Sequence, residues 1–185
     1  MNIVKSNIVG IDLKIKEFQD FLYPKIKTLW NLNDDNFNMY GRAYRNQTKD
    51  GYIPEAHIGN GEYNDVFPND TLNASAFFGV KENSVMSTTI IDASVTDVFL
   101  IFMVDLSKIK PGDERNDEQS HVDIQKLCSS RHFGFQMVGL TTGLDSVFSE
   151  YSGWRKQEGI KYRDMHPLHC FRINFKLNYH ILTNK

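Results

Sequence analysis

The stretch of sequence that decides the fold is Phe171-Arg-Ile-Asn-Phe-Lys-Leu-Asn-Tyr-His-Ile181, in which apolar and polar residues alternate without a break. A period of two places successive side chains on opposite faces of an extended strand. We therefore predict a half-buried antiparallel strand that is longer than the usual ~5–6 residues. A strand of this length can extend beyond the domain and pair with the edge of a neighbouring subunit.

A second predicted strand, Asp97–Leu106, contains the apolar run Val-Phe-Leu-Ile-Phe-Met-Val. Neither face of this strand is polar, so we expect both faces to be covered. Other strand-like segments are short and separated by polar turns, which predicts a loop-rich region over residues 39–92. The remaining predicted strands are 39–44, 74–80, 87–91 and 133–140, with an extended loop or hairpin over 58–68.

Helical periodicity appears in three places. In the first, Ile11, Ile15 and Phe18 recur at spacings of four and three, which places them on one face of a helix. The predicted helices cover 11–29, with a kink or break at Pro24, then 114–128 and 144–151. We predict one α+β domain over residues 1–185, a mainly antiparallel sheet flanked by two or three helices, with long loops or hairpins for subunit contacts.

The composition is that of an ordinary globular protein. Of the 185 residues, 41% are hydrophobic and 24% are charged, and the net charge is −2. These values exclude a wholly disordered or collagen-like chain, and Val98–Val104 is far shorter than the ~20 residues of a membrane-spanning helix. The near-neutral charge gives no general attraction to nucleic acid or to anionic membranes.

The two cysteines, Cys128 and Cys170, have no paired spacing, and their sequence positions leave open whether they lie close together. The first residues lack the apolar core of a signal peptide. We therefore expect a reduced intracellular environment, with both thiols acting as small buried hydrophobic groups.

A search for catalytic motifs finds one candidate cluster. Asp164, His166 and His169 have the side chains that a zinc site uses, although a complete site would need a distant ligand such as His121 or Cys128. A small metal-dependent hydrolase is therefore kept as the alternative function. Nucleophile-elbow, phosphate-loop, dinucleotide-binding and His-Glu-x-x-His motifs are missing from the sequence. We expect no enzymatic activity, no cofactor and no bound metal.

Aromatic and arginine side chains gather in the loop-rich region, and these are the residue types that anchor protein interfaces. Acidic residues over 50–70 argue against the competing role of stacking single-stranded nucleic acid. The predicted interface residues are Tyr40, Arg42, Tyr44, Arg45, Tyr52, Tyr63, Phe67, Phe171 and Phe175.

Three groups of motifs together resemble a known class of proteins. They are Tyr40-Gly-Arg-Ala-Tyr-Arg45 with Gly51-Tyr-Ile-Pro-Glu55; residues 97–106 with Arg115-Asn-Asp-Glu118 and His121-Val-Asp-Ile124; and residues 143–153 with Asp164-Met-His-Pro-Leu-His-Cys-Phe-Arg172. The chain resembles structural proteins of tailed bacteriophages that infect Bacteroides-type hosts, including crAss-like phages, and most of all their neck or tail-completion (tail-terminator) proteins.

The resemblance implies a ring-forming subunit between portal and tail, with an antiparallel sheet, flanking helices and protruding loops or hairpins. Its partners would be further copies of itself and other connector, portal or tail proteins. Double-stranded DNA would pass through the lumen as cargo, and no membrane would be involved. The protein would be located in the virion, after assembly in the host cytoplasm. A host-directed interaction module that is not packaged is a third possibility.

Overall fold

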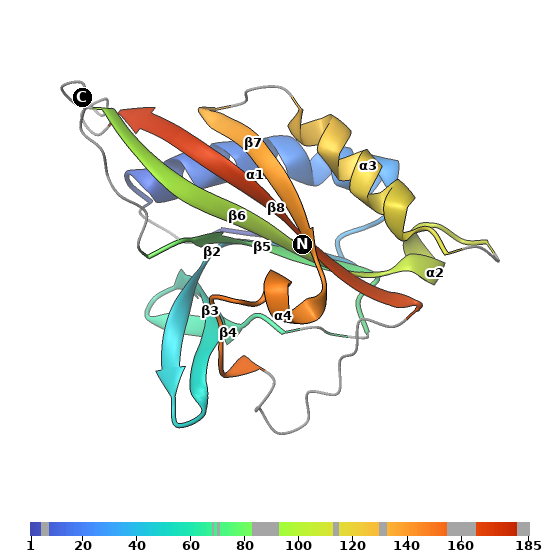
Figure 1. Ribbon diagram of the computed structural model, residues 1–185, viewed down its shortest axis with the longest axis horizontal. Helices are drawn as coiled ribbons and strands as arrows, with labels where there is room; N and C mark the ends of the chain where they lie inside the picture. Colours follow the sequence, from blue (N-terminus) through green and yellow to red (C-terminus); the bar gives the residue numbers. More distant parts are fainter. Residues whose placement is uncertain are drawn as a thin grey trace.

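The computed structural model describes residues 1–4, 8–67, 69, 71–82, 93–112, 115–129, 133–154 and 166–180. Within these residues the chain has an α+β fold, with a mostly antiparallel eight-stranded mixed sheet and four helices (Figure 1). The strands are β1 (Asn2–Ile3), β2 (Phe37–Thr48), β3 (Gly51–Gly59), β4 (Glu62–Asp65), β5 (Ala74–Val80), β6 (Ala93–Asp105), β7 (Phe135–Thr142) and β8 (Leu168–His180). The helices are α1 (Ile11–Leu29), α2 (Leu106–Ile109), α3 (Asp117–Cys128) and α4 (Leu144–Val147).

The strand predicted from the alternating pattern is β8, and it lies inside the sheet. The strand order is β4-β3-β2-β5-β6-β8-β7, with β1 beside β2. β8 pairs with β6 from Leu168 to His180 on one side and with β7 from Phe171 to Leu177 on the other. The predicted strand is confirmed, but its predicted pairing with a neighbouring subunit is wrong over residues 171–177, because both edges are already hydrogen-bonded there.

The central sheet, by which we mean β1, the first half of β2, β5, β6, β8 and β7, has an apolar layer on each face. The larger layer packs α1 and α3 against inward residues of the strands, and its centre is the stacked ring pair Phe102–Phe171, with centroids 5.0 Å apart. The smaller layer lies on the opposite face and packs Phe77 and Phe99 against residues of α4 and the turns after it. β6 contributes to both layers, as its uninterrupted apolar sequence predicted.

The second face of β8 is more buried than its polar residues indicate. Arg172 is only 7% exposed, and its guanidinium lies 3.9 Å from the centre of the Phe99 ring. Its Nε donates a 2.7 Å hydrogen bond to Asn174, and the Glu150 carboxylate lies 3.8 Å from its nearest nitrogen. The segment that contains α4 therefore covers this face, which the alternating pattern alone had predicted to be open to solvent.

The predicted helix over 11–29 is confirmed as α1, and the helix predicted over 114–128 is α3, which begins at Asp117. α1 continues without a break through Pro24, because Leu22, Ile26 and Trp30 are buried on both sides of it and hold the helix to the sheet. α3 is fixed to the end of α1 by Asp123, which accepts a 3.0 Å hydrogen bond from the Trp30 indole. The predicted helix over 144–151 is confirmed only in its first turn, α4, and continues as turns.

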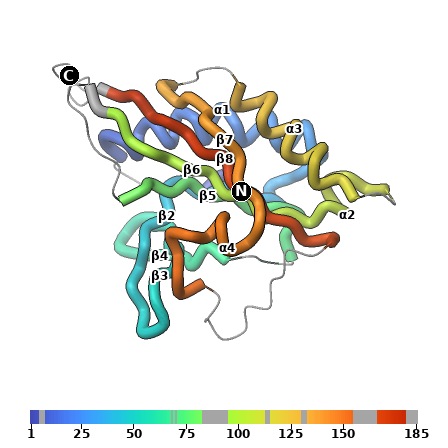
Figure 2. The backbone as a smooth tube through the Cα atoms, viewed as in Figure 1, coloured from blue at the N-terminus to red at the C-terminus, as the bar shows by residue number. Residues whose placement is uncertain are grey.

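The loop-rich region is more ordered than predicted. Residues 43–65, here called the hairpin layer, comprise the second half of β2 together with β3 and β4, and they extend to one side of the central sheet (Figure 2). The predicted hairpin within 58–68 is confirmed, and its turn is Asn60-Gly61, both with positive φ. The predicted strand at 87–91 lies outside the described residues.

One contact between the hairpin layer and the segment after α4 is especially close. The Gly153 N–H donates a 2.8 Å hydrogen bond to the Tyr52 carbonyl, and a side chain added to Gly153 would come within 2.6 Å of the Gly51 backbone. Glycine at position 153 is therefore required for the segment after α4 to approach β3 this closely.

Candidate functional site: an aromatic and cationic face on the hairpin layer

Seven of the nine predicted interface residues lie in or beside the hairpin layer. Tyr44 and Arg45 belong to its first strand, Tyr52 to β3 and Tyr63 to β4. Tyr40 and Arg42 precede the layer on β2, and Phe67 follows β4 by two residues. These seven residues span 28 sequence positions, and the structure places Tyr44 and Tyr63 on one face of the layer and Arg45 and Tyr52 on the other.

Both arginines are held over tyrosine rings. The guanidinium carbon of Arg42 lies 4.7 Å from the centre of the Tyr44 ring, and that of Arg45 lies 3.9 Å from the centre of the Tyr52 ring. Arg45 also forms an ion pair with Glu82. Such stacking limits the rotamers of both partners, so these side chains lose less entropy when a ligand or protein binds.

Asp12 of α1 links the face to the helical layer. Its carboxylate accepts a 3.1 Å hydrogen bond from the Tyr44 hydroxyl and lies 3.8 Å from the Arg42 guanidinium. The start of α1 therefore positions both members of the Arg42–Tyr44 pair.

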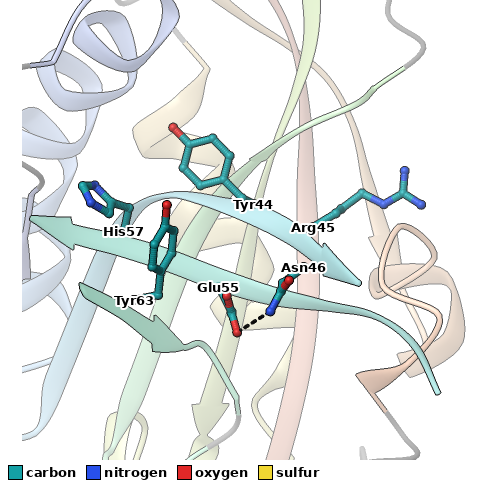
Figure 3. Close-up of a pocket in the computed structure, with 6 residues that line it drawn as sticks. All are labelled: Tyr44, Arg45, Asn46, Glu55, His57 and Tyr63. Atoms are coloured by element: carbon teal, nitrogen blue, oxygen red, sulfur yellow. Dashed lines mark hydrogen bonds between the residues drawn. The ribbon is translucent and has the colours of Figure 1, made fainter. Parts of the chain in front are cut away.

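A groove of about 540 Å³ opens on the hairpin layer (Figure 3). It is lined by Tyr44, Arg45, Asn46, Glu55, His57 and Tyr63. Figure 3 shows Arg45 pointing away from the other five side chains. Its guanidinium contacts Tyr52 and Glu82 instead. The groove is polar and aromatic, and its walls are side chains of paired strands, so it is largely preformed.

Cross-strand pairs build the floor of the groove. Asn46 Nδ2 donates a 2.8 Å hydrogen bond to Glu55 Oε1, and the ring of His57 lies 4.9 Å from that of Tyr63, which it faces in the β3–β4 register. Tyr63 is 56% exposed, the largest exposure among the tyrosines that the structure describes. Sequence reasoning missed Asn46, Glu55 and His57 as site residues. The Asn60-Gly61 turn predicts the hairpin but would place Ile58 opposite Tyr63, and the irregularity between His57 and Gly59 shifts the register so that His57 lies there instead.

Tyr40 and Phe67 are only partly exposed. Both pack against the smaller apolar layer, and burial raises the pKa of the Tyr40 hydroxyl, while its hydrogen bond with Asn38 acts in the opposite direction. Tyr40 and Phe67 therefore pack mainly against the protein interior and offer little surface to a partner.

Phe171 and Phe175 are core residues. They are 0% and 1% exposed and pack in the larger apolar layer with α1 and β7. Their full burial corrects the prediction that they contact a partner, because the monomer leaves no surface of either ring accessible.

The two histidines of the alternative metal site differ in burial, and one of them pairs with a histidine from α3. His166 is exposed, His169 is buried, and Asp164 lies outside the described residues. His169 Nε2 instead lies 2.8 Å from Nε2 of His121 on α3. Burial, followed by the neighbouring His169, lowers the pKa of His121, while Glu118 and Asp117 act in the opposite direction. Among the residues that the structure describes, no three His, Cys, Asp or Glu side chains are grouped to hold a metal ion.

The cysteines lie on opposite faces of the sheet. Cys128 belongs to the larger apolar layer and Cys170 to the smaller one, and both side chains are buried. Burial raises the pKa of the Cys128 thiol to about 12, so it is protonated at neutral pH and behaves as an apolar group.

Comparison with known proteins leaves the family open. No protein-family model matches the chain, and no curated protein matches its sequence significantly. None of the helices in the described part of the chain is long and apolar enough to cross a membrane. The resemblance to phage neck proteins therefore stays a prediction that rests on the sequence motifs.

Proposed function

We propose that this protein is a structural, non-enzymatic virion protein of a tailed phage, a ring-forming subunit of the portal–tail connector of the neck or tail-completion type. Head-to-tail contacts between identical subunits would close into a ring. The ring would bind neighbouring portal or tail proteins, and double-stranded DNA would pass through its lumen.

The observation that carries the proposal is the set of aromatic and cationic side chains on the hairpin layer, with Tyr44 and Tyr63 on one face and Arg45 and Tyr52 on the other. Tyrosine and arginine dominate the binding energy of protein interfaces, because they combine large apolar area with hydrogen bonding. Here two Arg–Tyr stacks are ordered before any partner binds, and Tyr63 stands exposed beside a groove. A monomer gains little from such an arrangement, whereas an interface gains affinity from it.

The charge around this face favours a protein partner over nucleic acid. β4 contributes Glu62 and Asp65, both exposed, and Glu55 lines the groove itself. These carboxylates would repel phosphate, whereas they can pair with cationic side chains of a neighbouring protein. A net charge of −2 also suits a ring that lets DNA slide without holding it.

The fold supports the same function through its rigidity. The hairpin layer continues from β2, whose first half is hydrogen-bonded within the central sheet beside β5. A force on the hairpin layer is therefore transmitted to the core through a continuous strand, as a subunit in a mechanical connector requires.

The proposal is tested by the oligomeric state of two matched variants. Tyr63→Ala removes the most exposed tyrosine of the face, and Val138→Ala changes a residue of similar exposure, 55%, on β7. Light scattering after size-exclusion chromatography should show that Tyr63→Ala reduces the oligomer while Val138→Ala leaves it unchanged. Equal behaviour of the two variants would contradict the assigned interface.

Mass spectrometry of purified virions tests the location. The protein should be present in a fixed ratio to the portal protein. A protein that is abundant in infected cells but missing from virions would instead be a host-directed module.

A further inference from the structure

A second and much smaller cavity lies where α1 meets β2, beside the groove, with which it shares His57. Its volume is about 20 Å³, and its polar lining includes Asp12, Gln19 and Arg42 beside Gly41. One water molecule needs roughly 10–15 Å³ of such space together with two to four polar partners. The cavity therefore has the size and the chemistry of a site for a single water.

Gln19 presents a buried acceptor at this cavity. The residue is 0% exposed, and among the described residues no donor reaches its Oε1. A buried carbonyl oxygen without a hydrogen bond is costly, so native proteins rarely leave one unsatisfied.

The orientation of the Gln19 amide is fixed by its other partners. Its Nε2 lies within hydrogen-bond distance of three acceptors, Asn2 Oδ1 at 2.7 Å and the carbonyl oxygens of Met39 and Ile3 at 2.9 and 3.1 Å, which share its two hydrogens. Asn2 cannot be turned around either, because its own Nδ2 donates a 3.0 Å hydrogen bond to Asp20. Rotating the Gln19 amide would oppose its oxygen to two carbonyls, so Oε1 must face the cavity.

We propose that this cavity holds one structural water molecule that donates a hydrogen bond to Gln19 Oε1. The water would donate a second hydrogen bond to the Asp12 carboxylate, and its oxygen would accept a hydrogen bond from the Arg42 guanidinium. The bound water would complete the polar network that joins α1, β1 and β2 at the base of the hairpin layer. This site does not depend on the proposed role in assembly.

Glycine at position 41 keeps the space open. A Cβ added there would lie 3.4 Å from Gln19 Oε1 and 4.0 Å from the Ile3 carbonyl oxygen, so alanine fits without a clash but occupies the water position. Gly41 also lies at the irregularity in the β2–β5 pairing, between Tyr40 and Arg42. Gly139 is a matched control: it lies at an irregularity of the β7–β8 pairing, and nothing is within 4 Å of its added Cβ.

The test compares Gly41→Ala with Gly139→Ala in thermal unfolding and in high-resolution crystal structures. Gly41→Ala should lower Tm by about 2–10 °C, because it displaces the water and leaves Oε1 unsatisfied. Gly139→Ala should leave Tm unchanged or raise it slightly, as alanine usually does at a compatible glycine position.

The crystal structures show whether loss of the water causes the change in Tm. The wild-type protein should show one spherical density peak within about 3.2 Å of Gln19 Oε1, and Gly41→Ala should lose it. An empty wild-type cavity, or a protein group in that position, would overturn the proposal whatever the Tm values. Equal Tm changes in the two variants would overturn it as well.

Discussion

The central sheet and the hairpin layer are joined by the same strand, β2, yet they are built from different side chains. In the central sheet, β5 and β6 place Phe77, Phe78 and Phe102 in the core with no exposed surface. In the hairpin layer, β4 is exposed along its whole length, and the three strands are linked by a tilted His57–Tyr63 ring contact and by a hydrogen bond between Asn46 and Glu55. The central sheet therefore supplies most of the stability, whereas the hairpin layer has surface available for binding.

The largest expected effect is in the central sheet. Phe171→Ala removes a fully buried ring that stacks on Phe102 and borders His121. We expect a loss of about 3–5 kcal/mol in the free energy of unfolding, measured by urea denaturation. A loss below about 1 kcal/mol would contradict the placement of Phe171 at the core.

The contact between the two regions should show an intermediate effect. In Gly153→Ala, the added methyl group meets the Gly51 backbone at 2.6 Å, so the backbone of one segment must move. We expect a loss of about 1–3 kcal/mol and, in amide hydrogen exchange, faster exchange in β3 than in β8. Gly139→Ala is the control. Equal acceleration of amide exchange in β3 and β8 would show that the hairpin layer and the central sheet open as one unit.

A smaller, pH-dependent effect is expected where α3 packs on the end of β8. Since the pKa of His121 is lowered by burial and by His169, the unfolded chain binds a proton more readily than the folded protein below pH ~6.5. The stabilisation from neutral His121 is therefore complete above that pH and is lost as the pH falls toward the folded-state pKa.

This dependence can be measured by urea denaturation between pH 7.5 and 5. His121→Gln removes the titrating ring and should flatten the decrease, although its stability at pH 7.5 should be lower. His57→Gln, in the hairpin layer, should retain the wild-type slope. An unchanged slope in His121→Gln would assign the pH dependence to other groups.

The smallest stability effect is expected at the most exposed tyrosine of the hairpin layer. Tyr63→Ala removes a side chain whose ring contact is His57, and exposed substitutions usually change stability by less than about 0.5 kcal/mol. Thermal unfolding of the monomeric form should therefore match that of the wild type. A large loss would mean that Tyr63 serves the fold and would weaken its role as a contact residue.

Much of the central sheet could be predicted from the sequence, because its patterns are local. The alternation from Phe171 to Leu177 and the apolar run of β6 each predict a strand without knowledge of the neighbours. The same patterns could not show that β8 is an interior strand, since that depends on β7 pairing with it. The burial of Arg172 was hidden for the same reason, because its partner Glu150 is supplied by a different segment.

The hairpin layer was predicted less well, because its strands are polar. Asn46, Gln47 and Thr48 lie beyond the strand predicted at 39–44, yet they pair with β3 as the end of β2. Cross-strand pairing overrides the low strand propensity of Asn46. The aromatic and arginine residues of the site were found by type, whereas their stacking and the His121–His169 pair depend on tertiary contacts between elements distant in sequence.

The most direct test of the central claim is single-particle electron microscopy of the purified wild-type protein, with its mass measured by analytical ultracentrifugation. The proposed function predicts closed rings with a central channel wide enough for duplex DNA, in which the hairpin layer of each subunit contacts its neighbour. A protein that stays monomeric at every concentration, both alone and when mixed with the portal protein, would contradict it.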